Sequence, residues 1–153
     1  MKRSALAWTS LCLRLQCVAG GQPSDLGLQE NVEKECIEEA SISSQLAREA
    51  RPSSAVAYKY ETRKGISPKT LFCYDLQVPT NFVPVNADGE VEQFYRIPLT
   101  ELVESISQHP EDWKPNSALV ALDFAIRQGA INPDIEPDFL QIVAMLRAGV
   151  VRK

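Results

Sequence analysis

Three glutamates that stand close together carry the clearest chemical signal in this sequence: Glu35, Glu38 and Glu39. In a helix, positions three and four apart share one face, so the three carboxylates would lie together. Like charges at that spacing repel one another, and a hard divalent cation such as Mg²⁺ or Mn²⁺ removes that cost because it prefers oxygen ligands. The spacing alone fits a solvated acidic face equally, and this is the commoner meaning of such a pattern.

The neighbouring residues predict the elements that position these carboxylates. A strand is predicted over residues 13–18 and leads into Gly20 and Gly21, which allow a tight turn and a close approach of the backbone. A helix is predicted over residues 28–40, with an apolar stripe at Leu28, Val32, Cys36 and Ile37. A glycine turn in front of an acidic helix can bring backbone and carboxylates to one site.

The stretch from Gly20 to Ile42 resembles the Nudix box, the loop–helix–loop signature of hydrolases that cleave a nucleoside diphosphate linked to another moiety. That signature is a glycine, five residues, a glutamate, seven residues and then R-E-U-x-E-E-x-G-U, where U is a bulky apolar residue. The registers agree without a gap. The matches are Gly20 for the first glycine, Lys34 for the arginine, Glu35, Glu38 and Glu39 for the helix glutamates, and Cys36 and Ile42 for apolar positions.

Three positions depart from the Nudix signature. Leu26 stands where the family has its first glutamate, which removes an outer acidic group and implies reduced metal affinity or activity. Lys34 replaces the arginine, so the charge is kept but the planar fork that orients a carboxylate is lost. Ser41 replaces the last glycine, where a left-handed backbone is usual.

Segments outside the box are similar to one Nudix branch, that related to the thiamine pyrophosphokinase-associated proteins of fungi and plants. This branch implies hydrolysis of thiamine diphosphate, or of its damaged oxo and oxy analogues, to the monophosphate. It also implies Mg²⁺ or Mn²⁺ as cofactor and a small-molecule diphosphate as the binding partner. The segments are residues 19–23, 72–76, 88–95 and 114–120, and the resemblance covers about residues 18–147.

The resemblance assigns the metal to the acidic helix. Glu35 and Glu39 are expected to be metal ligands, and Glu38 either a third ligand or the catalytic base that takes a proton from water. Glu90 or Glu92, just after a turn, is expected to add a ligand from another element, although a solvated turn acid is the other meaning of either residue. The metal set is therefore Glu35, Glu38, Glu39 and Glu90.

Substrate contacts are expected from two turns. Gly20 and Gly21 would let the backbone approach the site, and Arg63 and Lys64 could meet phosphate. The second pair lies where a hairpin is predicted, and the tip of a hairpin is usually only solvated.

The order of predicted elements is strand, helix, strands and helices, which gives an α/β (α+β) class. The Nudix resemblance refines this to an α/β/α sandwich with a mixed sheet that lacks some N-terminal strands. Three parts are expected: an atypical N-terminal segment at 1–16, a Nudix hydrolase-like domain at 17–149 and a tail at 150–153. Beyond the acidic helix, strands are predicted at 55–61, 69–78 and 91–97, and helices at about 100–106, 119–128 and 137–146.

The composition excludes several function classes. The 153 residues carry a net charge of −4, which gives no basic face for nucleic acid. The sole histidine, His109, lies in a polar loop stretch, so a histidine-based triad is disfavoured. No apolar run is long enough to cross a bilayer. The cysteines lack C-x-x-C spacing and are expected to be reduced thiols; they are Cys12, Cys17, Cys36 and Cys73.

The first residues leave the cellular location open. Met1 to Leu11 combines basic and apolar residues and fits a short targeting signal, while alternating leucines up to Leu15 fit a strand, which we favour. We expect a cytoplasmic protein, with a mitochondrial or plastid location as the alternatives. We also expect residues 1–11 to be loosely attached to the fold.

A second function class stays open at this point. Leu26 and the short segment before Gly20 also fit a catalytically inactive Nudix fold that binds a diphosphate compound or a partner protein.

Overall fold

The computed structural model describes residues 6–11, 15–18, 20–87, 89 and 91–148. The chain contains runs of strands and runs of helices, which confirms the predicted α+β class. In chain order the elements are β1 (Leu6–Leu11), β2 (Leu15–Gln16), α1 (Leu28–Ala40), α2 (Ser44–Ala47), β3 (Arg51–Thr62), β4 (Gly65–Asp75), β5 (Gln93–Pro98), α3 (Leu99–Gln108), the 3₁₀ turn η1 (Pro110–Asp112), α4 (Pro115–Arg127) and α5 (Phe139–Met145).

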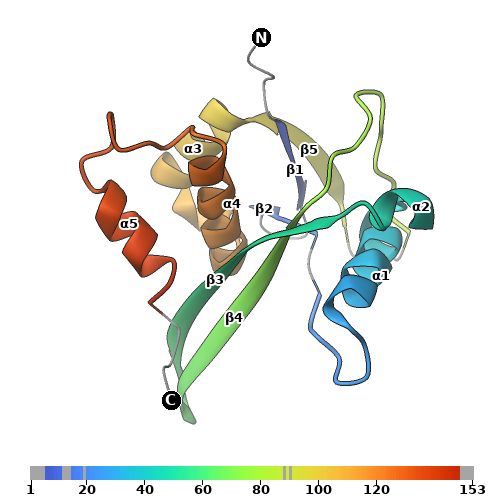
Figure 1. Cartoon of the computed structure of the whole chain (residues 1–153), viewed down its shortest axis with the longest axis horizontal. Coiled ribbons are helices and arrows are strands. Elements are labelled where there is room, and N and C mark those ends of the chain that lie inside the picture. The colour runs from blue at the N-terminus through green and yellow to red at the C-terminus, as the bar shows by residue number, and fades with distance from the viewer. Residues whose placement is uncertain (1–5, 12–14, 19, 88, 90, 149–153) are drawn as a thin grey trace.

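Helices lie on both sides of the strands. Figure 1 shows α1 and α2 on one side and α3, α4 and α5 on the other, with the strands running between them. This is the layered arrangement expected for an α/β/α sandwich. None of the helices within the described ranges is long and apolar enough to span a membrane.

The strands form two antiparallel sheets. One has the order β2-β1-β5, and the other is the β3–β4 ribbon. The expected mixed sheet is not seen among the described residues, whose strand pairings are all antiparallel; Leu15 and Trp113 form only an isolated parallel bridge. The predicted hairpin is confirmed, and its turn depends on Gly65, whose φ of +115° favours glycine. The Thr62 hydroxyl closes the turn by donating to the Gly65 carbonyl at 2.8 Å.

The front segment is better attached than its sequence predicts. Residues Leu6–Leu11 pair with β5 over six positions, from Leu6 opposite Pro98 to Leu11 opposite Gln93. The expectation of a loose segment is therefore wrong for these residues. The reason is that backbone hydrogen bonds in a ladder do not need a clear apolar period in the sequence. Residues 1–5 and 12–14 lie outside the described part of the chain.

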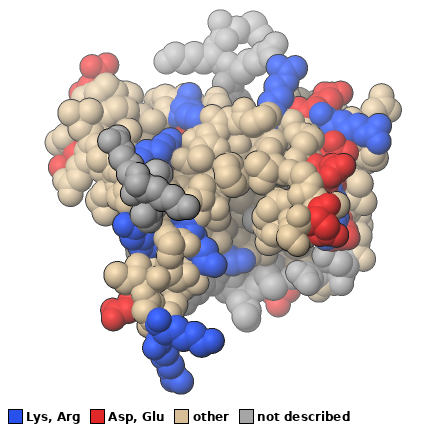
Figure 2. All heavy atoms as spheres, turned by 60° about the horizontal axis from the view of Figure 1, so that its bottom comes forward, with Lys and Arg blue, Asp and Glu red and all other residues tan. Residues whose placement is uncertain are grey.

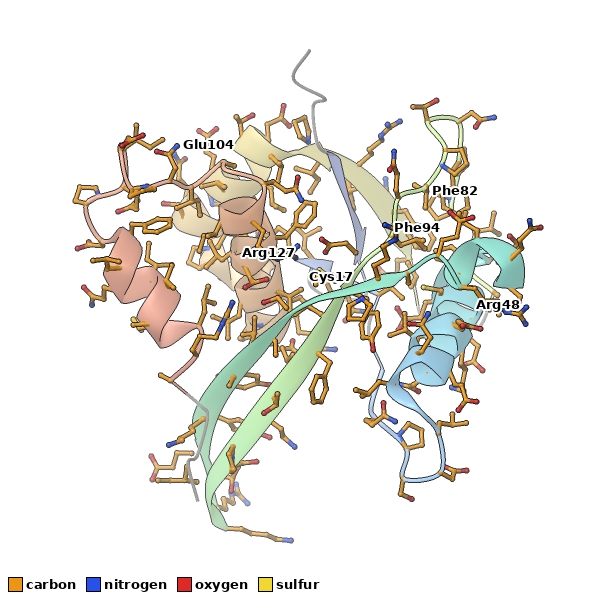
Figure 3. The ribbon with its side chains drawn as sticks, viewed as in Figure 1. Cys17, Arg48, Phe82, Phe94, Glu104 and Arg127 are labelled. Atoms are coloured by element: carbon orange, nitrogen blue, oxygen red, sulfur yellow. The ribbon has the colours of Figure 1, made fainter. Side chains whose placement is uncertain are left out.

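Three apolar clusters hold the layers together. The cluster beneath α1 contains Cys36, Ala40, Ile42 and Ala47, with Phe82 and Phe94 packed against it (Figure 3). The second joins α3 and α4 through Leu102, Ile106, Trp113 and Ala121. The third attaches the β3–β4 ribbon to the C-terminal part through Val56, Cys73 and Leu146. The first cluster is the one that positions the acidic helix.

A buried charged network strengthens the third contact. Asp123 on α4 is only 2% exposed and accepts hydrogen bonds from Arg127 at 2.8 Å, Arg147 at 2.7 Å and Ser54 at 2.9 Å. Arg127 also pairs with Asp75 at the end of β4 through two nitrogens. The network therefore connects α4, both ribbon strands and the segment after α5.

Candidate functional site

Local contacts define both ends of α1. At the start, the Gly27 amide donates to the Glu30 side chain at 2.9 Å, which satisfies a backbone donor that the helix itself cannot use. At the end, Ser41 adopts a left-handed backbone with φ +52° and ψ +33°, and its amide donates to the Ile37 carbonyl at 3.1 Å. The chain thus turns sharply at the position where the sequence pattern expects glycine.

The rotation of α1 about its axis is set by the apolar cluster beneath it. Cys36 and Ala40 are buried there, and this rotation carries Asn31 and Glu39 inward as well, at 6% and 5% exposed. The Glu35 side chain is 16% exposed. Asn31, Glu35 and Glu39 follow one another at four-residue intervals, so they lie along one face of the helix.

Glu38 lies on a different part of the helix surface from Glu39. Its side chain is 47% exposed, and its carboxylate contacts the Lys34 ammonium at 2.7 Å. Lys34 also reaches Glu35 at 3.4 Å, so the one ammonium lies between two of the three carboxylates. The hydrogen bond with Glu38 is the main cause that raises the pKa of Lys34 above its usual value. The structure thus separates a partly buried pair of acids from an exposed one.

The glycine turn packs directly on the acidic face. A Cβ atom added to Gly20 would lie 2.0 Å from Cδ of Glu35 and 2.1 Å from its Oε1, far inside contact distance. Gly21 contacts the same face in another way, because its carbonyl accepts a hydrogen bond from the Asn31 side-chain nitrogen at 3.2 Å. A Cβ on Gly20 would thus displace the Glu35 carboxylate, whereas a Cβ on Gly21 would meet nothing within 4 Å.

This arrangement offers oxygen atoms of the kind that Mg²⁺ and Mn²⁺ prefer. Glu35 and Glu39 supply carboxylates, and the carbonyl oxygen of Asn31 is buried with no hydrogen-bond partner. The Gly20 backbone leaves room beside Glu35 that any larger residue would fill. Within the described ranges, however, no three His, Cys, Asp or Glu side chains stand close enough together to hold a metal ion. Neutral oxygens would therefore have to complete the ligand set.

The thiols near the site are not suited to act as ligands or nucleophiles at neutral pH. Burial is the main cause that raises the pKa of Cys17 to about 12 and those of Cys36 and Cys73 to about 11, and the negative charge of Glu39 adds to the shift at Cys17 and Cys36. All three are free thiols, as predicted, and Cys12 lies outside the described residues. They therefore stay protonated.

Comparison with known proteins finds similar sequences with a printed function. The chain is 41% identical over 132 residues to Nudix hydrolase 24, chloroplastic, of Arabidopsis thaliana, which covers 86% of this chain. It is also 41% identical over 130 residues to Nudix hydrolase 20, chloroplastic, of the same plant, which covers 85%. The chain is thus similar in sequence to two proteins named Nudix hydrolases. It is 32% identical over 141 residues, 84% of the chain, to an uncharacterised protein of Saccharomyces cerevisiae.

The chain corresponds to only part of these relatives. It spans 36% and 34% of the two plant Nudix hydrolases and 41% of the yeast protein. No family model matches the chain.

Other residues that the Nudix resemblance singles out lie away from α1 or outside the described chain. Arg63 and Lys64 form the exposed turn between β3 and β4, at the far end of the ribbon from the acidic helix (Figure 1). Figure 2 shows basic side chains projecting there, while acidic side chains gather on the side of the molecule formed by α1 and α2. Glu90 lies outside the described residues, and Glu92 is exposed.

Leu26 is partly buried in the loop before α1. Its carbonyl accepts a hydrogen bond from the Gln22 side chain at 2.7 Å, which braces the loop. This contact uses the backbone only, so it does not depend on the leucine that stands where the Nudix signature has glutamate.

Asn31, which was not predicted from the sequence, lies on the acidic face and contacts the glycine turn. The sequence does contain a hint, because Asn31 is four residues before Glu35 and would therefore share its face of the helix. Only its burial and its contact with Gly21 set it apart from other polar positions of α1.

Proposed function

We propose that this protein is a Nudix hydrolase that depends on Mg²⁺ or Mn²⁺ and cleaves the diphosphate linkage of a small compound. The substrate class is thiamine diphosphate or its oxidised analogues, and the product is the monophosphate. The main support is the register of the acidic helix: Glu35 and Glu39 face inward beside the Gly20 turn, in a chain 41% identical to two plant Nudix hydrolases.

In this mechanism, Glu35 and Glu39 would hold the cation, which would neutralise charge on the diphosphate and make water more acidic. The Gly20 backbone lies close to the Glu35 carboxylate, and Glu39 is buried at 5% exposed. Carboxylates positioned before the substrate arrives would limit the reorganisation that the reaction requires.

Glu38 is the residue we propose as the base. It is exposed enough to meet water, and Lys34 holds its carboxylate by a contact of 2.7 Å. In the reaction, a water oxygen attacks one phosphorus atom, and its proton passes to the Glu38 carboxylate. The bond from that phosphorus to the bridging oxygen breaks, and the other phosphate leaves with the bridging oxygen.

The second candidate is a Nudix fold that binds a diphosphate compound without cleaving it. Two observations favour it: Leu26 occupies the position of the first family glutamate, and no cluster of three acidic or other ligating side chains is assembled within the described ranges. In this case the chain would bind substrate and cation but release no phosphate.

A turnover panel separates the two candidates. The purified chain would be offered thiamine diphosphate, its oxo and oxy analogues and nucleoside triphosphates, each with Mg²⁺, with Mn²⁺ or with a chelator. We expect metal-dependent release of the monophosphate, fastest with the thiamine compounds. Much faster cleavage of nucleotides would reject the substrate class, and binding without turnover would support the second candidate.

Glu39→Gln provides the test of the residue assignment. We expect it to lose Mn²⁺ binding and turnover, because the amide keeps the shape of the side chain but not its charge. Glu104→Gln is the matched control, since Glu104 lies on α3, on the other side of the strands (Figure 3). Equal Mn²⁺ binding by wild type and Glu39→Gln would reject Glu39 as a ligand.

We propose a cytoplasmic location and leave a plastid location as the alternative, because the printed names of both plant relatives include "chloroplastic".

A further inference from the structure

Asn31 carries an unusual combination of burial and missing contact. The residue is 6% exposed, and its side-chain nitrogen donates to the Gly21 carbonyl at 3.2 Å. Its side-chain oxygen has no hydrogen-bond partner, and it is the one buried side-chain oxygen or nitrogen in the described part of the chain for which this is so. A buried acceptor without a hydrogen-bond donor destabilises a fold, so its presence in the structure calls for a reason.

The orientation of the Asn31 amide is set by its neighbour. A side-chain amide can be turned over so that its oxygen and nitrogen exchange places. Here the turned amide would put its oxygen against the Gly21 carbonyl oxygen, and two acceptors repel each other. The nitrogen therefore faces the glycine turn, and the carbonyl oxygen must point away from it.

The surroundings of Asn31 belong to the acidic face. Glu35 is four residues further along α1, where side chains on a helix become neighbours, and Glu39 follows after another four. The same turn contacts both residues, because Gly20 packs on Glu35 and Gly21 accepts from Asn31. Asn31, with its unpartnered neutral oxygen, thus shares a helix face with Glu35 and Glu39, whose side chains are largely buried.

We infer that the side-chain carbonyl of Asn31 is a further oxygen donor of the divalent-cation site, acting on the cation directly or through one of its water ligands. The inference rests on the proposed function. Amide oxygens are accepted ligands of hard cations, and Mg²⁺ keeps several of its waters when bound to protein. A neutral donor adds no repulsion to Glu35 and Glu39, and it extends a ligand set that lacks a third assembled acidic group.

The rival role for Asn31 is to hold the Gly21 turn and nothing more. The two roles use different atoms, since the turn is held by the nitrogen and the cation would be met by the oxygen. Asn31→Ala removes both atoms. Asn31→Asp removes the donor to Gly21 but keeps an oxygen for the cation and adds charge. Gln29→Ala is the matched control, because Gln29 lies on the same helix and is not part of the face defined by Asn31, Glu35 and Glu39.

The experiment titrates Mn²⁺ into each purified protein and follows free Mn²⁺ by electron paramagnetic resonance, with a thermal melt of the metal-free proteins as a folding check. We expect Asn31→Ala to bind Mn²⁺ about 10- to 100-fold more weakly, as is typical when a group supporting a metal site is lost. Asn31→Asp should bind at least as tightly as wild type, although its metal-free melting temperature should fall. Gln29→Ala should match wild type in affinity.

Two results would overturn the inference. If both Asn31 variants bind Mn²⁺ as wild type does, the oxygen has no part in the site. If both variants lose Mn²⁺ affinity equally, the lost hydrogen bond to the Gly21 turn explains the whole effect. In either case a defect in Glu39→Gln would leave the proposed function intact, whereas a wild-type chain that binds no Mn²⁺ would remove the proposed function and this inference together.

Discussion

The close contact between Gly20 and Glu35 makes the substitution Gly20→Ala a sharp test of the site. The new Cβ would lie 2.0 Å from Cδ of Glu35, and ordinary contact begins at 3.4 Å, so the carboxylate would have to move by about 1.4 Å. The atoms that must move are the far end of a flexible side chain. The backbone can therefore stay where it is while the carboxylate leaves its position.

Activity and stability should respond very differently to Gly20→Ala. A displacement of about 1 Å at a catalytic group can cost about 100-fold in rate, and we expect a loss of that order in kcat/KM. The free energy of unfolding should change by less than about 1 kcal/mol, because alanine reduces the entropy of the unfolded chain and the clash falls on the far end of the Glu35 side chain.

The assay compares Gly20→Ala with Gly21→Ala, whose new Cβ meets nothing within 4 Å. Turnover of the best substrate and Mn²⁺ affinity would be measured beside urea unfolding for both variants. We expect Gly21→Ala to behave as wild type. A fully active Gly20→Ala variant would refute the reasoning, and an equal loss in both variants would show that turn flexibility matters and not the contact with Glu35.

Two further predictions concern stability. Ser41→Gly should stabilise the fold by about 1 kcal/mol in urea unfolding, because serine is strained at φ +52°, and a lower midpoint would contradict this. Asp123→Asn should destabilise it by about 2 kcal/mol, since charged hydrogen bonds to Arg127 and Arg147 are lost. Burial alone would raise the pKa of Asp123, but hydrogen bonds from Arg127, Arg147 and Ser54 outweigh it and hold the pKa below its usual value. This stabilisation is therefore complete above the unfolded pKa of about 3.9 and is lost as the pH falls through the lower folded pKa. The difference between wild type and Asp123→Asn should shrink below about pH 4, and a constant difference down to pH 2 would contradict the assignment.

Several elements could be predicted because their signals are local. The helix at 28–40 follows from an apolar stripe with helical period, and the structure has the same bounds. The β3–β4 hairpin follows from apolar runs on either side of a turn with Gly65. The polar stretch after Ser41 gave no such signal, and it holds the short helix α2 and the first residues of β3. Its structure depends on packing against α1, which the sequence pattern does not report.

The sequence by itself determined the register of the Nudix-like motif and the helix that carries it, because spacing along one helix is independent of the rest of the fold. Only the tertiary structure decided which side chains share an environment. The apolar cluster under α1 sets the rotation that buries Glu39 and leaves Glu38 exposed with Lys34. The glycine turn packs against Glu35, and its Gly21 carbonyl orients the Asn31 amide by accepting a hydrogen bond. These contacts join segments that are separate in the chain, and their geometry comes from packing between layers, which residue spacing cannot encode.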